Sequence, residues 1–309
     1  MKNFYLITLF MCLSNLQAWA TGSSEKAVYD LIERVTPGYA SQYRLEIIPS
    51  ENGNDVYEVD GDGQKIILRG NNAVSLATAF NWYLKYTCHA HVSWFGNQLE
   101  LPEKLPQPAH KERRIINGKY RVYMNYCTVS YTAAWWNWER WQQELDYMAM
   151  NAINMPLFSV GLDGVWYNTL LRFNFTEEEA RAFLTGPGHS AWQWMQNIQS
   201  YGGPLPKSVI DKHVALGKKI LARQLELGMQ PIQQGFSGYV PRELQKKYPQ
   251  AKISMKRKWC GFDGTAQLDP TDPLFHEMGL AFLEEQDKLF GSYGAYAADP
   301  FHESAPPVD

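Results

Sequence analysis

The chain has 309 residues, of which 45% are hydrophobic and 20% charged, and its formal net charge is −3 at pH 7. This composition is typical of a globular protein, and the length suits two domains better than one. The small negative charge gives no electrostatic reason to bind nucleic acid or an anionic membrane surface, so neither is expected as a partner.

The first twenty residues have the organisation of a signal peptide. Lys2 is followed by an apolar run over residues 4–13, and Ala18-Trp19-Ala20 matches an A-x-A cleavage site. We therefore predict a signal peptide over residues 1–20 and a secreted or periplasmic protein. The run is too short to span a bilayer, and no other segment is a candidate span. Lipidation at Cys12 is the weaker alternative, because Met11 stands where a small residue is expected.

Residues 24–108 are predicted to form a small α/β domain. Apolar residues recur at helical spacing over residues 24–35 and 72–87. Between these two helices, alternating segments bounded by Asn-Gly and Asp-Gly turns predict three strands, over residues 43–50, 55–63 and 64–70. A charged, Pro-rich stretch follows, and we place the domain boundary near residue 109.

Residues 110–309 alternate between predicted strands and helices, which favours a parallel sheet. Four strands are expected, over residues 119–131, 152–161, 229–238 and 293–303. Helices are expected between and beside them, over residues 136–151, 176–184, 208–228 and 272–291. In the second of these helices, Thr176 and Glu179 have the spacing of a capping box.

Polar and aromatic residues gather where these strands end, as they do at the active-site face of a (β/α)8 TIM barrel. Such a barrel needs roughly 250 residues, and this region offers about 200. The predicted fold class is therefore α/β, with a small N-terminal α/β domain followed by the first half, about four of eight strands, of a TIM barrel. An open doubly wound sheet is the structural alternative.

The segment ADPFHE, residues 298–303, holds the leading candidate for catalysis. Glu303 follows the last predicted strand, where apolar walls would raise the pKa of a carboxyl group and make it a usable general acid. Asp299 and His302 are close enough in sequence to orient it or to bind substrate. A solvated acid at a strand end is the plainer alternative. Consecutive residues rarely converge on one ion, so no metal or other cofactor is expected.

Glycoside hydrolysis generally needs a second carboxylate. Asp163 ends the second predicted strand, whereas Asp263 and Asp269 lie in a loop. None of the three occupies the place of a barrel-mouth partner from a later strand.

Other polar and aromatic residues are candidates for substrate binding. Asn125 and Cys127 end the first predicted strand, and Trp192 and Trp194 lie in a Gly- and Pro-rich loop where they could form a sugar platform or pack in the core. Cys127 has no evident base nearby, so a cysteine hydrolase is set aside. The charge run over residues 256–258 is predicted to be a solvated patch.

Three cysteines remain after the signal peptide, which leaves at least one unpaired within the chain. They are Cys88, Cys127 and Cys260. Neither CxxC nor zinc-ligand spacing occurs among them. The fold is therefore expected to depend on its core rather than on disulfides.

Several separated motifs, in order along the chain, resemble those of the α-N-acetylglucosaminidases of glycoside hydrolase family eighty-nine. They are NYCTVSYTAAWWNWERWQQELDYMAMNAIN, TGPGHSAW, GGPLP and DPFHE. The resemblance covers nearly all of the chain after residue 20. It implies a leading α/β domain, a TIM barrel, a helical C-terminal domain, and retaining removal of terminal α-linked N-acetylglucosamine.

The resemblance also implies roles for individual residues. Glu303 matches the general acid/base, and His302 is expected near the 2-position of the sugar. Asn125, Cys127 and Trp192 match positions around the sugar subsite. Asp163 is also counted among the candidate substrate-binding residues. Its loop VGLDGVW, which often reads G-Q-E in relatives, departs from the family pattern at Leu162 and Asp163.

The length also departs from the family. The nucleophilic carboxylate of the family comes from a later barrel strand, and a retaining mechanism needs it. We therefore expect this chain to represent the N-terminal part of a longer enzyme. A non-catalytic or vestigial carbohydrate-binding protein is the alternative.

Overall fold

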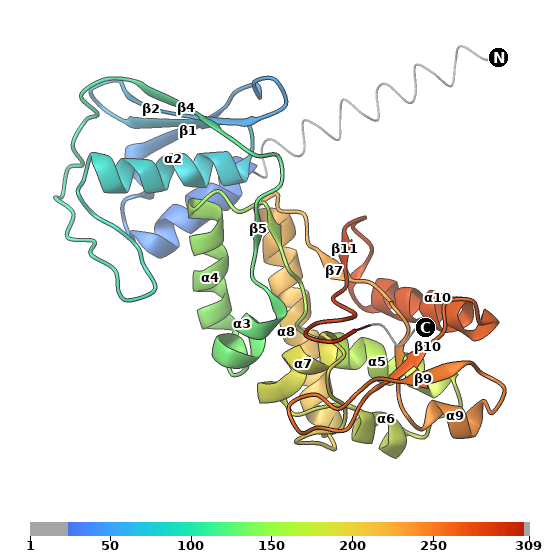
Figure 1. Cartoon of the computed structure of the whole chain (residues 1–309). Helices are drawn as coiled ribbons and strands as arrows, with labels where there is room; N and C mark the ends of the chain where they lie inside the picture. Colours follow the sequence, from blue (N-terminus) through green and yellow to red (C-terminus); the bar gives the residue numbers. More distant parts are fainter. Residues whose placement is uncertain (1–23, 306–309) are drawn as a thin grey trace, which may run out of the picture. The chain divides into compact units, whose positions relative to one another are not determined.

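The computed structural model describes residues 24–305, so the predicted signal peptide lies outside the described residues. The chain divides into two compact units (Figure 1). The first unit runs to residue 123 and includes residues 142–156 and 223–230; the second holds residues 124–141, 157–222 and 231 onward. Within the described range, no helix has both the length and the apolarity needed to cross a membrane.

A four-stranded sheet is the centre of the first unit, in the order β1-β3-β2-β4. Its strands are β1 (Tyr43–Ile47), β2 (Asp55–Gly61), β3 (Ile66–Gly70) and β4 (Glu112–Ile116). The first three agree with the predicted strands, but β4 lies beyond the boundary placed near residue 109. It pairs antiparallel with β2, so the N-terminal sheet continues past residue 108.

Helix α2 (Ala73–Tyr86) covers one face of this sheet (Figure 1). Asn72 caps its start by accepting a hydrogen bond from the backbone N–H of Ser75, as short polar side chains do at helix N-termini. The stripe predicted from Leu76, Phe80 and Leu84 is fully buried. A second helix spans residues 24–35, followed by the 3-10 turn η1 (Ala40–Gln42).

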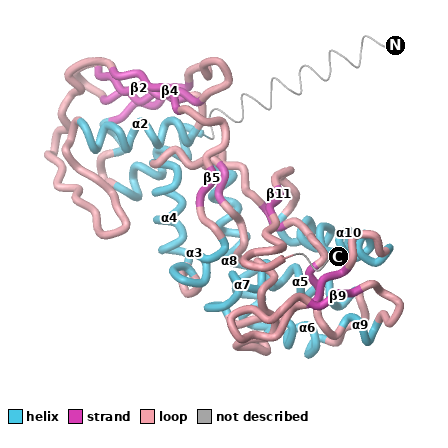
Figure 2. The backbone as a smooth tube through the Cα atoms, in the orientation of Figure 1, coloured by secondary structure: helices cyan, strands magenta, loops and turns pink. Residues whose placement is uncertain are grey.

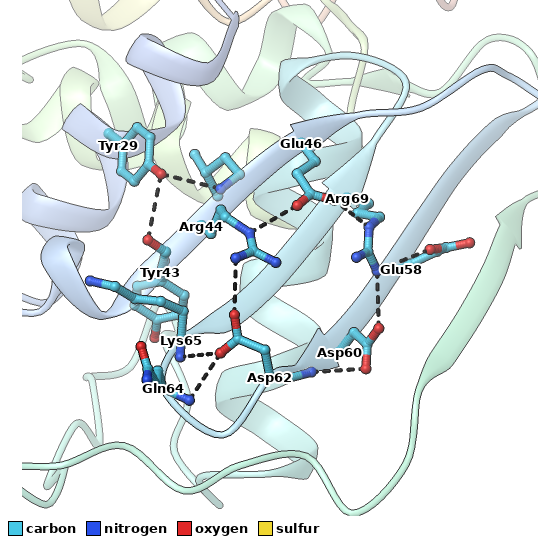
Figure 3. A network of polar contacts seen from close by, with 12 residues as sticks. Tyr29, Tyr43, Arg44, Glu46, Glu58, Asp60, Asp62, Gln64, Lys65 and Arg69 are labelled. Carbon is cyan, nitrogen blue, oxygen red and sulfur yellow. Dashed lines mark hydrogen bonds and ion pairs between the residues drawn. The ribbon is translucent and has the colours of Figure 1, made fainter.

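The opposite face of the sheet carries a row of alternating charges. Arg69 of β3 bonds Glu46 of β1 at 2.5 Å and Glu58 of β2 at 3.5 Å (Figure 3). Glu58 in turn accepts a bond from Arg113 of β4 at 2.6 Å. Burial raises the pKa of Glu58, but its bonds to Lys111 and Arg113 hold that pKa below its usual range. Opposite charges directly across a sheet support one register of pairing.

The first unit also contains a parallel pair of two-residue strands. β5 (Val122–Tyr123) lies beside β6 (Met155–Pro156). The predicted strand over residues 119–131 is wrong beyond residue 123. The chain instead forms the helical turns α3 (Tyr126–Thr128) and η2 (Val129–Ala133), the latter a π-helical turn.

In the second unit, parallel pairing continues at later positions of the chain. Leu157 bridges Ile232, and β7 (Gln233–Gln234) pairs with β11 (Tyr296–Ala297). These pairs confirm the expectation of parallel strands. The strands are much shorter than predicted, and loops occupy most of the remaining length (Figure 2).

Most of the regular secondary structure of the second unit is helical. Its helices include α5 (Leu162–Arg172), α6 (Glu177–Phe183), α7 (Ser190–Trp194), α9 (Leu244–Lys247) and α10 (Pro273–Phe290), with the 3-10 turn η3 (Pro187–His189). The helices α4 (Trp138–Met150) and α8 (Lys207–Glu226) contribute residues to both units. The predicted capping box of Thr176 and Glu179 is confirmed at the start of α6.

A small antiparallel sheet, which the sequence did not predict, lies between α8 and α10 along the chain. Its order is β8-β10-β9, with β8 (Tyr239–Val240), β9 (Ile253–Met255) and β10 (Ala266–Leu268). The connection from β9 to β10 carries a tight hairpin tip, where Trp259 bridges Phe262. This connection holds two residues of the candidate site.

Candidate active site

The site begins with the turn that follows β11. Asp299, His302 and Glu303 come together there, as predicted: His302 Nδ1 lies 3.2 Å from Asp299 Oδ2, and His302 Nε2 lies 3.8 Å from Glu303 Oε1. The segment is a turn rather than the end of a long strand, because β11 stops at Ala297. Glu303 has φ of 48°, a left-handed conformation that costs a non-glycine residue free energy and is often found at functional sites.

Trp259, which the sequence analysis missed, contacts the central carboxylate directly. Its indole Nε1–H donates to Glu303 Oε2 at 3.0 Å. The hairpin tip fixes this tryptophan: Cys260 and Gly261 both have positive φ, and Phe262 N–H donates back to Trp259 O at 2.8 Å. Two central residues with positive φ are typical of a type I′ turn. The Cys-Gly pair after Trp259 is the local signal that could have indicated this turn.

The expectation that apolar walls surround Glu303 is wrong for the described residues. The Glu303 side chain is 61% exposed. Its described partners are the Trp259 indole and the His302 imidazole, which orient the carboxylate while leaving it open to solvent. A carboxylate held in this way is accessible to a bound substrate.

Two further side chains hold the backbone of the turn. Asn197 Nδ2 donates to His302 O at 2.8 Å, and Lys256 Nζ donates to Pro300 O at 2.5 Å. Lys256 is 8% exposed, so the solvated patch predicted for residues 256–258 is wrong at this position. Arg257 and Lys258 are exposed, as predicted. Local sequence could not distinguish the three residues, because only packing against the turn buries the first.

Cys127 and Asn125 lie just after β5, in the second unit. Burial raises the pKa of the Cys127 thiol, and the charges of Asp299 and Glu303 raise it further. The thiol therefore stays protonated at neutral pH, which agrees with setting a cysteine nucleophile aside. The Asn125 side chain caps α3, accepting from Thr128 N at 3.0 Å and from Thr128 Oγ1 at 2.9 Å.

The two loop tryptophans have different surroundings. Trp192 is half-buried, and its ring packs edge-on against Tyr131 with centroids 5.0 Å apart. Trp194 is 5% exposed and belongs to the core. Of the two, Trp192 therefore keeps a surface on which a sugar ring could stack.

Asp163 is not brought to Glu303 by any contact that the structure records. It lies in the first turn of α5, is 5% exposed, and its Oδ2 is 2.6 Å from His213 Nδ1. Burial lowers the pKa of His213, but the bond to Asp163 holds it above its ordinary value. This pair lines a cavity of about 230 Å³ whose walls include Trp136, Trp141 and Trp194.

Within residues 24–305, no three His, Cys, Asp or Glu side chains are grouped closely enough to hold a metal ion. The cysteines of the same range, Cys88, Cys127 and Cys260, are free thiols.

Lys256 gives the site a measurable pH signature. Burial lowers its pKa from 10.5 to about 8, and Asp299 opposes that change. Between these two values the folded protein has released a proton that the unfolded chain still holds, so the free energy of unfolding rises with pH. The cost of burying the charged form is fully present below about pH 8 and is relieved above it.

We expect the unfolding free energy of the wild type, relative to Lys256→Met, to rise by on the order of 3 kcal/mol between pH 8 and pH 10.5. Denaturant titrations of both proteins across this range measure the difference, and the other titrating groups largely cancel. A difference that does not change with pH would contradict the burial of a charged Lys256.

Family models match both regions of the chain. The alpha-N-acetylglucosaminidase (NAGLU) N-terminal domain matches residues 26–107, and the tim-barrel domain of the same name matches residues 121–309. This chain belongs to the alpha-N-acetylglucosaminidase family. The resemblance inferred from DPFHE and the other motifs is thereby confirmed.

Relatives of known sequence and structure agree with this assignment. Human alpha-N-acetylglucosaminidase is 35% identical over 290 residues, which cover 91% of this chain and 39% of the human protein. A family 89 glycoside hydrolase from Clostridium perfringens, in complex with 2-acetamido-1,2-dideoxynojirmycin, matches with a TM-score of 0.91 and 33% identity. That match covers 98% of this chain and 35% of the bacterial one. The same bacterial enzyme, with two Glu→Gln changes, has been solved with its substrate GlcNAc-alpha-1,4-galactose at the same TM-score.

The chain thus spans 35–39% of the length of these alpha-N-acetylglucosaminidase relatives.

Proposed function

We propose that the complete gene product is an exo-acting, retaining alpha-N-acetylglucosaminidase that removes terminal α-linked N-acetylglucosamine from glycans. The observation that carries the proposal is the geometry of Glu303. Its carboxylate is held by Trp259 and His302 in a turn after a parallel strand, within a region that matches the family's tim-barrel domain. The carboxyl ends of such strands are where barrel enzymes keep their catalytic groups.

In this mechanism Glu303 acts twice. As a general acid it donates a proton to the leaving oxygen of the glycosidic bond, and as a general base it later deprotonates the attacking water. The Trp259 indole donates to Oε2, so Oε1 remains to carry the transferred proton toward the substrate. His302, fixed through its other nitrogen by Asp299, faces the same oxygen and can orient it.

We propose that Asn125, Cys127 and Trp192 form the sugar subsite. Burial raises the pKa of the Cys127 thiol and the charges of Asp299 and Glu303 raise it further, which supports a place near the acid/base. A neutral thiol and an exposed asparagine suit contact with uncharged sugar hydroxyls. Asp163 is bound to His213 in a separate cavity, so this geometry gives it no direct contact with the reacting sugar.

A retaining mechanism also needs a nucleophilic carboxylate that forms a glycosyl-enzyme intermediate. We assign no residue among 24–305 to that role. We further propose that the short parallel strands β5, β6, β7 and β11 belong to the first half of a TIM barrel. This proposal rests on the parallel pairs and on the match of residues 121–309 to the family's barrel domain.

Export is proposed from the sequence, because residues 1–20 have the charge, apolar run and cleavage pattern of a signal peptide. An exported glycosidase would meet its glycans outside the cytoplasm. The C. perfringens relative binds GlcNAc-alpha-1,4-galactose, and we propose the same type of linkage as a substrate here.

A small panel of glycosides tests the function. The purified complete gene product is incubated with the 4-nitrophenyl α- and β-glycosides of N-acetylglucosamine, with 4-nitrophenyl α-N-acetylgalactosaminide, and with GlcNAc-alpha-1,4-galactose. We expect hydrolysis of the α-N-acetylglucosaminide and the disaccharide only. Binding without turnover would instead support the carbohydrate-binding alternative, and a preference for the β-anomer would contradict the proposal.

A further inference from the structure

Lys256 is a buried cation beside the turn that carries Glu303. It follows β9, and its backbone N–H donates to Thr265 O at 2.8 Å, which fixes it in the small antiparallel sheet. Its side chain turns inward and is 8% exposed, while the adjacent Arg257 and Lys258 face solvent. The burial is therefore specific to one position of a run of three cations.

The ammonium group is directed at the catalytic turn. Its Nζ donates to the carbonyl oxygen of Pro300 and lies 5.2 Å from the centre of the Phe301 ring. Gln196 supplies the other acceptors, with its backbone oxygen at 3.5 Å and Oε1 at 3.4 Å from Nζ. Pro300 and Phe301 separate Asp299 from His302, so Lys256 holds the middle of the segment that carries all three polar residues.

Gln196 is itself fixed, which makes it a firm support for Lys256. Thr265 Oγ1 donates to Gln196 O at 2.7 Å, and the Gln196 side chain donates to Ser237 Oγ. Thr265 also accepts the backbone bond from Lys256. The backbone of Lys256 is thus held by Thr265 and its ammonium group by Gln196, and both partners lie outside the turn.

Burying an ammonium group is costly unless hydrogen bonds and an opposite charge compensate it. Here burial lowers the pKa of Lys256 to about 8, and Asp299 is the acid whose charge favours the protonated form. An apolar side chain would avoid this cost but would leave Pro300 O without its donor. The burial of Lys256 therefore lowers local stability but fixes the position of the turn.

The same connection between β9 and β10 also carries Trp259, three residues further on. Lys256 bonds the backbone near the start of the turn, and Trp259 bonds the Glu303 carboxylate at its end. Displacing the turn at Pro300 would therefore move the Glu303 carboxylate relative to the indole that orients it.

We propose that Lys256 is a positioning residue for the general acid: by holding the backbone of the turn at Pro300, it sets the place of the Glu303 carboxylate. This inference rests on the proposed function. Lys256 has no contact with the reacting atoms in this account and acts only through the turn.

The test compares two substrates that differ in their need for an acid. GlcNAc-alpha-1,4-galactose has a poor leaving group and depends on protonation, whereas 4-nitrophenyl α-N-acetylglucosaminide has a good one. Lys256→Met, with a side chain of similar length and no charge, is expected to lower kcat/KM for the disaccharide by about 10- to 100-fold, as a small misplacement of a catalytic group does. The loss for the aryl glycoside should be much smaller.

Two variants accompany it. Lys256→Arg keeps a buried cation and is expected to recover most of the disaccharide activity. Arg257→Met removes the exposed neighbouring cation and should leave kcat/KM unchanged for both substrates. Circular dichroism and thermal unfolding establish that each variant is folded; if Lys256→Met is not, Lys256→Gln is judged by the same ratio of the two kcat/KM values.

The outcomes separate this inference from the proposed function. Lys256→Met could lower kcat/KM equally for both substrates or for neither, while Glu303→Gln lowers it selectively for the disaccharide. In that case the positioning role is wrong and the proposed function stands. If Glu303→Gln shows no selective defect, the proposed function itself fails.

Discussion

Glu303→Gln is expected to lower kcat/KM for GlcNAc-alpha-1,4-galactose by about 10²- to 10⁴-fold, the usual contribution of a general acid. Glutamine keeps the length of the side chain and can still accept the Trp259 bond, but its amide cannot donate a proton to the leaving oxygen. The aryl glycoside needs little protonation, so its kcat/KM should fall far less. Initial-rate kinetics of the complete gene product on both substrates measure this difference.

Glu277→Gln is a matched control for that experiment. Glu277 lies on the exposed side of α10, far from the turn in sequence. Its replacement by glutamine makes the same change of charge and shape as Glu303→Gln. It should behave as the wild type on both substrates. Unchanged turnover of the disaccharide by Glu303→Gln would remove the central residue from the mechanism.

Trp166→Ala is expected to lower the free energy of unfolding by about 3–5 kcal/mol, the usual cost of deleting a large aromatic side chain from a core. Trp166 of α5 is 4% exposed. Its ring packs against Phe282 at 5.0 Å, Phe183 at 5.5 Å and Tyr239 at 5.7 Å between centroids. These partners come from three separate segments of the second unit, so they cannot all close around the space that the indole leaves.

Trp135→Ala is the control for this loss, because Trp135 is 79% exposed and should cost less than about 0.5 kcal/mol. Denaturant unfolding followed by circular dichroism compares the two variants. If Trp166→Ala were no more destabilising than Trp135→Ala, the aromatic cluster would not be the core of the second unit.

The N-terminal sheet could be predicted well from sequence, because its signals are local. Strand alternation and the Asn-Gly and Asp-Gly turns located β1, β2 and β3 within a few residues. β4 was missed, since its residues are almost all charged or exposed and only its pairing with β2 makes it a strand.

Helix α5 shows a different limit of sequence reading. Eight of its residues are buried, from Leu162 to Leu170, so polar and apolar positions do not alternate with the helical period. Gly161, with φ of 95°, begins it without a side-chain cap. Neither of the usual helix signals was therefore present.

The positions of the short parallel strands could be predicted from the sequence, but their lengths could not. Residues 119–131 are apolar enough for a long strand, yet pairing stops at Tyr123 because β6 offers only two partner residues. Asn125 then caps a helical turn. The extent of a strand depends on its neighbours, which sequence near the strand does not report.

Some residues of the candidate site could likewise be predicted from the sequence, and others could not. Asp299, His302 and Glu303 are consecutive enough to be recognised from sequence. Lys256 and Trp259 reach them across more than forty residues, through the fold of the hairpin. A charge run and a loop tryptophan carry no local sign of such contacts.

The most direct test of the account uses Glu303→Ala with 4-nitrophenyl α-N-acetylglucosaminide and added sodium azide. If Glu303 is the acid/base of a retaining enzyme, azide attacks the glycosyl-enzyme intermediate without needing a base. We therefore expect azide to restore turnover and proton NMR to identify the product as the α-glycosyl azide. A β-glycosyl azide would make Glu303 the nucleophile instead, and the absence of any rescue or azide product would contradict its role as the acid/base.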